Sequence, residues 1–77
     1  MESLAVLYEI VSSTGVLVAT LPAAGPSPQL LALRMLYDLS GCNHEPLTLW
    51  RLTFGGHVSA LPVCCLFQGA IAPLPEC

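Results

Sequence analysis

The clearest hydrophobic pattern lies in PSPQLLALRMLYDLSG, residues 26–41. Ser27 is placed to act as an N-cap, and Pro28 falls in the first turn, where its missing N–H costs no hydrogen bond. Gly41 follows as a C-terminal stop. The large apolar residues recur three and four positions apart, as on one helix face: Leu30, Leu33, Leu36, Tyr37 and Leu39. The pattern predicts one complete amphipathic helix, whose apolar face must be buried against something.

The other apolar segments indicate secondary structure less decisively. Residues 2–13 have apolar side chains at helical spacing and predict a first helix. Residues 15–21, GVLVATL, fit either a short β-branched strand or a continuation of that helix. Residues 47–54, LTLWRLTF, also fit both templates, and residues 59–69 fit a last short helix. We expect helices in all of these segments, because no neighbour offers an evident partner strand.

These expectations add up to an all-α fold. It is either a small helical hairpin or three to four short helices joined by Gly/Pro turns, forming one unit over residues 1–69. A loose, proline-containing tail, residues 70–77, would follow this unit.

The first predicted helix, the proline-marked turn PAAGPSP and the second helix PQLLALRMLYDLSG carry a likeness that covers roughly residues 2–54. This arrangement resembles one unit of a HEAT or armadillo-type α-solenoid. Such arrays need about three repeats to be stable, and no second copy at a fixed period is visible. The resemblance therefore implies a fragment or short isoform of a scaffold protein.

Composition narrows the partners. Of the 77 residues, 55% are hydrophobic and only 9% are charged, where about 25% charged is usual. Arg34 and Arg51 are the only fixed cations, which excludes a nucleic-acid footprint and a polybasic membrane patch. A surface so poor in charge does not easily keep a lone monomer in solution. The apolar surface is therefore expected to meet another protein, a second copy or a bilayer.

No motif carries chemistry with useful specificity. There is no phosphate-binding glycine loop, nucleophile elbow or carboxylate cluster, so we expect no enzyme, no cofactor and no small-molecule substrate. The four cysteines, expected to be free thiols, are Cys42, Cys64, Cys65 and Cys77. A zinc site could combine Cys42, His44, His57 and Cys64 or Cys65, but these ligands lack the usual close pairing. The vicinal cysteines in VCCLF are also candidates for acylation at a membrane.

Three hypotheses about function follow. The first is a non-enzymatic helical module that binds a protein partner or a second copy, using Leu30, Leu33, Leu36, Tyr37, Leu39 and Trp50. The second is a small membrane-associated protein that inserts around residues 58–74. The third is a truncated or recently arisen product without a defined biochemical function. Cytoplasm is the default location, with membrane association as the alternative.

Overall fold

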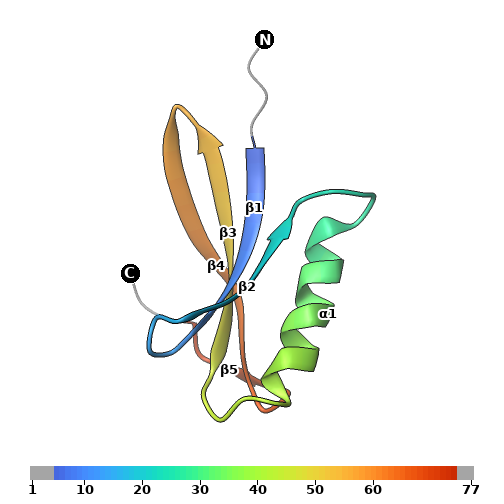
Figure 1. Cartoon of the computed structure of the whole chain (residues 1–77), viewed down its shortest axis with the longest axis vertical. Coiled ribbons are helices and arrows are strands. Elements are labelled where there is room, and N and C mark those ends of the chain that lie inside the picture. Colours follow the sequence, from blue (N-terminus) through green and yellow to red (C-terminus); the bar gives the residue numbers. More distant parts are fainter. Residues whose placement is uncertain (1–4, 75–77) are drawn as a thin grey trace.

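The computed structural model describes residues 5–74, which form one antiparallel sheet and one helix (Figure 1). The elements in chain order are β1 Ala5–Ser12, β2 Leu17–Pro22, α1 Pro28–Ser40, β3 Leu47–Gly55, β4 His57–Phe67 and β5 Ala70–Ala72. The strand order is β2-β1-β3-β4-β5, and every neighbouring pair is antiparallel. Because β2 and β3 both run opposite to β1, they are parallel to each other, and α1 connects them across β1.

The all-α prediction and the resemblance to a HEAT or armadillo unit are wrong. Among residues 5–74 the only helix is Pro28–Ser40, and the other segments expected to be helical form strands there. In β1 the side chains of Tyr8 and Ile10 point to one face of the sheet and those of Leu7 and Val11 to the other. A run that is apolar on both faces satisfies the helical period as well as the strand period. Residues 5–12 form a strand rather than a helix because they pair with β2 and β3.

The partner strand that residues 15–21 seemed to lack is β1 itself. The two strands form a hairpin in which the Gly15 N–H donates to the Ser12 carbonyl oxygen at 3.0 Å. Gly15 has a φ of +87°, a left-handed conformation that a residue with a Cβ adopts only with strain. A left-handed residue at the last position of the loop is typical of hairpins whose strands are joined by three residues.

Pro62 lies inside β4, where a proline would normally argue against a strand. The pairing register with β3 shifts between Leu49 and Trp50, so β4 carries a bulge beside this proline. The outer side of β4 is paired with β5 only from Cys65 to Phe67. The missing N–H of Pro62 therefore removes no ladder bond to an outer strand, which is how prolines are accommodated in sheets.

The hydrophobic core lies between α1 and one face of the sheet. Its buried members are Tyr8, Ile10, Ala32, Leu36, Leu47, Leu49 and Leu66. On the helix, Ala32, Leu36 and Ser40 recur every four residues and are fully buried. The helix predicted within residues 26–41 is thus confirmed, and the side that packs on the chain's own sheet is centred on Ala32, Leu36 and Ser40.

The helix ends differ in detail from the sequence prediction. Ser27 occupies the N-cap position, but its side chain makes no capping hydrogen bond. Gly41 adopts a right-handed φ of −69° at the C-cap rather than the left-handed one. The Asn43 side-chain amide instead donates to the Leu39 carbonyl oxygen at 2.7 Å.

Candidate protein-interaction surface

The sheet has two faces, and α1 covers part of one of them, leaving Arg51 and Leu61 on that side exposed. The opposite face, which we call the open face, follows from the strand registers and from the alternation of side chains along each strand. Its residues are Ala5, Leu7, Glu9 and Val11 from β1, Leu17, Thr20 and Pro22 from β2, Thr48, Trp50, Leu52 and Phe54 from β3, Val58, Ala60, Pro62, Cys65 and Phe67 from β4, and Ala70 and Ala72 from β5.

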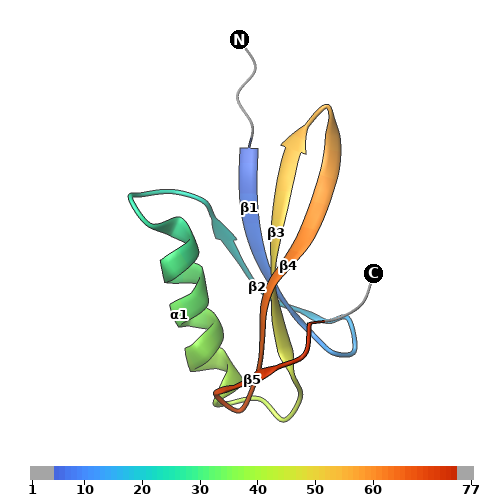
Figure 2. The ribbon, with the colours of Figure 1, turned by 180° about the vertical axis from the view of Figure 1, so that it is seen from behind.

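Among residues 5–74 no other element lies over the open face. All six elements are accounted for by the sheet and by α1, which contacts β1, β3 and β4 from the other side (Figures 1 and 2). Trp50, Leu52 and Phe54 are half-buried, and Thr48 and Cys65, at the other end of the open face, are buried. Ala60 and Val58 are exposed.

The open face is almost free of charge. Glu9 is its single charged side chain, and Arg51 on β3 lies on the helix side, opposite Tyr8 of β1. With strands about 4.8 Å apart and about 3.4 Å per residue, four strands and eight residues span roughly 500 Å². Thr48 and Cys65 lie buried within this area, and most of its other side chains are apolar and half-buried or exposed. Contiguous apolar surface of this kind indicates an interaction site.

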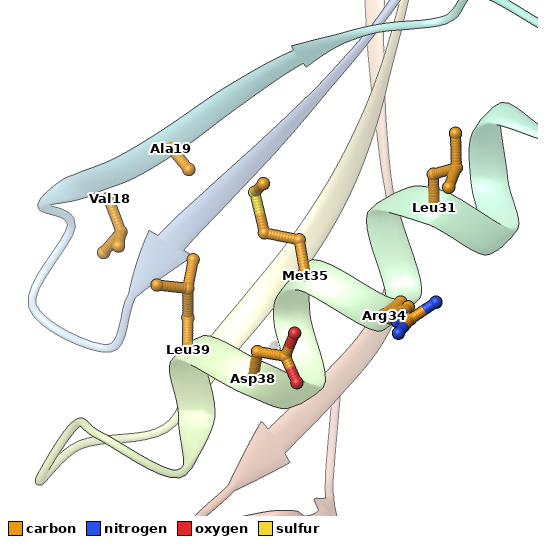
Figure 3. A pocket seen from close by; sticks show the side chains of 7 residues that line it. All are labelled: Val18, Ala19, Leu31, Arg34, Met35, Asp38 and Leu39. Carbon is orange, nitrogen blue, oxygen red and sulfur yellow. The ribbon is translucent and has the colours of Figure 1, made fainter.

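A second surface feature is a groove of about 410 Å³ between β2 and α1 (Figure 3). Five apolar side chains and two charged ones line it: Val18, Ala19, Leu31, Met35, Leu39, Arg34 and Asp38. The register between β1 and β2 shifts at this point, and the bulge lets the consecutive residues Val18 and Ala19 both line the groove. Arg34 and Asp38 carry opposite charges, so the groove favours neither anionic nor cationic ligands.

The predicted partner-binding residues are divided among different environments. Leu36 is fully buried in the core, and Leu33 and Leu39 are half-buried beside it, so the molecule's own sheet occupies this helix face. Leu30 and Tyr37 are exposed by 66% and 59%. The binding of a partner by these helix residues stays a prediction.

Trp50 is the one member of that predicted set that belongs to the open face. Sequence reasoning missed the rest of this face. The available signal was β1, where Leu7 and Val11 are apolar in addition to the alternating Tyr8 and Ile10. A strand that is apolar on both faces must bury both.

The predicted thiol chemistry finds little support in the positions of the cysteines. Cys42, Cys64 and Cys65 are free, and Cys77 lies outside the described residues. Cys64 lies on the helix side and Cys65 on the open face, where only 4% of it is exposed. Acylation of these two residues stays a prediction, but burial leaves a reagent little access to Cys65 in the folded chain.

The residues considered for zinc do not converge. Within the part of the chain that the structure describes, no three His, Cys, Asp or Glu side chains are grouped so that they could hold a metal ion. His57 begins β4 at the end of the β3–β4 hairpin, whereas Cys42 and His44 follow the C-terminal end of α1. The histidines and cysteines considered for zinc therefore form no metal site in the described part of the chain.

A polar cluster connects the β1–β2 turn to the loop before β3. The Glu45 carboxylate accepts hydrogen bonds from the Thr14 hydroxyl at 3.0 Å and the Ser13 hydroxyl at 3.3 Å. Hydrogen bonding, foremost from Thr14 and then from Ser12 and Ser13, lowers the pKa of Glu45 below its ordinary value of 4.5. All of these groups are turn hydroxyls around one exposed carboxylate, which is typical of a turn-stabilising contact rather than of a catalytic site.

The segment predicted to insert into a membrane, residues 58–74, forms most of β4 and all of β5. No helix within residues 5–74 combines the length and the apolar character needed to cross a membrane.

In comparisons with family models, curated proteins and solved structures, the chain matches none of them.

Proposed function

We propose that this chain is a non-enzymatic protein-interaction module that binds through the open face of its sheet. The observation that carries this proposal is a set of large apolar side chains on the open face, Trp50, Leu52 and Phe54, that are only half-buried and on which no element among the described residues packs. Burial of such a surface favours association by about 25 cal/mol per Å² before the costs of binding.

Several features of the open face support a protein as its ligand. A sheet face is broad rather than concave, whereas small-molecule sites are enclosed clefts. Trp50 and Phe54 supply the large aromatic side chains that carry much of the binding energy in protein interfaces. The open face offers no cation to an anionic lipid surface or to a nucleic acid.

The free thiols of Cys42, Cys64 and Cys65 support a reducing compartment such as the cytoplasm.

The test compares two adjacent residues of β4 that point to opposite sides of the sheet. Ala60 belongs to the open face, and Leu61 lies on the helix side, 61% exposed, opposite Arg51. A photo-crosslinking benzophenone amino acid is placed at either position in the full chain, and the chain is expressed and irradiated in cells. We expect protein adducts from position 60 and few or none from position 61.

Equal labelling from both positions, or no protein adduct from position 60, would overturn the proposal. Adducts from position 60 that consist only of lipid would likewise overturn it and would favour the membrane-associated alternative. Circular dichroism of each purified variant checks that the sheet is retained.

A further inference from the structure

We infer that the open face binds the same face of a second copy of this chain, so that two sheets pack face to face around a two-fold axis. This inference rests on the proposed function and names its partner. The pair would be a sandwich with a helix on each outer side and the two open faces in the middle. Closed two-fold pairs are the commonest form of self-association.

The area of the face matches what a small dimer needs. Each copy contributes roughly 500 Å² of sheet footprint, so a face-to-face pair removes on the order of 1,000 Å² from water. That value reaches the lower limit of a specific interface, which is about 1,000 Å² in total. The side chains of Trp50, Leu52 and Phe54 project from the open face, so their contact with a second copy buries further area. Two sheets packed in this way have the usual inter-sheet distance of about 10 Å.

The edges of the sheet favour pairing by faces over pairing by edges. At one edge, β2 ends in Pro22 and carries a bulge beside Val18. At the other edge, β5 has only three residues, and the part of β4 that β5 leaves unpaired contains Pro62 and a bulge. Prolines and bulges on edge strands prevent the addition of a further strand. Self-association is therefore directed to the open face.

Charge on the open face distinguishes a second copy from a foreign partner. Glu9 is the single charged side chain there, and the open face presents no cation to it. In a pair of identical faces Glu9 loses water without gaining an opposite charge, so Glu9→Gln should tighten the dimer severalfold. A foreign partner that supplies a cation to Glu9 would bind the Glu9→Gln variant more weakly.

The experiment is sedimentation equilibrium of the purified full chain over a wide range of protein concentration. We expect a reversible change from 8.1 kDa at low concentration to twice that mass at high concentration. Ala60→Asp places an unpaired charge on the open face and should weaken the dimer more than about a hundredfold. Leu61→Asp, the adjacent change on the other side of β4, should leave the dimer intact.

Each outcome decides the inference. A wild-type chain that stays at 8.1 kDa at all concentrations overturns it, as does a dimer that Leu61→Asp disrupts as strongly as Ala60→Asp. If the chain is monomeric but position 60 still crosslinks other proteins in cells, the second copy is excluded while the proposed function stands. If neither association nor crosslinking occurs, both fail. Because Ala60 is exposed, Ala60→Asp should fold, and circular dichroism at low concentration verifies this.

Discussion

The two ends of strand β3 differ in cover although both are rich in apolar residues. At the start of β3, Leu47 and Leu49 on the helix side and Thr48 on the open face are all buried. Further along, Leu52 and Phe54 on the open face are only half-buried, and Arg51 on the helix side is exposed. The difference teaches that cover by α1 reaches only the first part of β3, and that no described element of the chain covers the apolar side chains beyond it.

The largest expected effect comes from truncating a leucine of β3 to alanine. The comparison is between Leu49, which α1 covers, and Leu52, which lies on the open face. Leu49→Ala opens a cavity between Ile10 of β1 and Cys64 of β4 and should cost about 2–5 kcal/mol of unfolding free energy. In a chain of this size that loss should leave much of the protein unfolded. Leu52→Ala should cost only about 1 kcal/mol in dilute solution, where the half-buried side chain has less contact to lose.

Urea unfolding followed by circular dichroism, at low protein concentration, measures both changes. Equal costs for the two variants would show that the two faces are equally buried and would remove the basis for an open face. If the chain dimerises, repeating the Leu52→Ala measurement at high concentration should raise its cost, while the cost of Leu49→Ala rises little.

A smaller loss of stability is expected from a substitution of Ser40, at the C-terminal end of α1. Ser40 is fully buried, and its hydroxyl donates to the Tyr37 carbonyl oxygen at 2.9 Å and accepts from the Gly69 N–H at 3.0 Å. This hydroxyl joins α1 to the β4–β5 turn, in which Gln68 and Gly69 both have positive φ. Ser40→Ala leaves the Gly69 N–H without its partner and should cost about 1–3 kcal/mol in urea unfolding.

The matched control is Ser27→Ala at the other end of the same helix. Its side chain makes no capping hydrogen bond, so this substitution should change the unfolding free energy very little. A cost for Ser27→Ala as large as that for Ser40→Ala would contradict this account of the two helix ends.

The smallest expected effect lies at the β1–β2 turn, away from both faces. Because the folded-state pKa of Glu45 is lowered, its hydrogen bonds stabilise the fold above about pH 4.5. That contribution is lost as the pH falls through the folded-state pKa. Glu45→Gln should therefore remove a small part of the acid dependence of stability, measured as the midpoint of acid unfolding.

An NMR titration of the Glu45 carboxyl carbon gives the direct measurement. Thr14→Val removes the strongest of its hydrogen bonds and should bring its pKa back toward the ordinary value. An unchanged pKa in this variant would show that Thr14 does not stabilise the carboxylate in solution.

The helix could be predicted from sequence because its signals are local. Pro28 at the start, leucines at helical spacing and Gly41 after the last turn identify α1 without reference to any other segment. The strands could not be predicted in the same way. β1 pairs with β3 at separations of 35 to 49 residues, and no local pattern records such a pairing.

The open face itself concealed the sheet from periodicity arguments. A sheet with a polar outer face produces clean alternation, whereas Leu7 and Leu52 fill the positions where polar residues would be expected. The candidate site was thus missed for the same physical reason that the fold class was wrong. Only Trp50 was identified in advance, as a large side chain suited to an interface.

The central place of β1 also orders the events of folding. The β1–β2 and β3–β4 hairpins each close a short loop and can form early, but the inner edge of β1 meets its partner only after β3 has been synthesised. Until then the first hairpin presents an unpaired strand with apolar side chains on both faces. The slow step of folding should be the joining of the two hairpins across β1 and β3, and a chain halted before Leu47 should be prone to aggregation rather than half-folded.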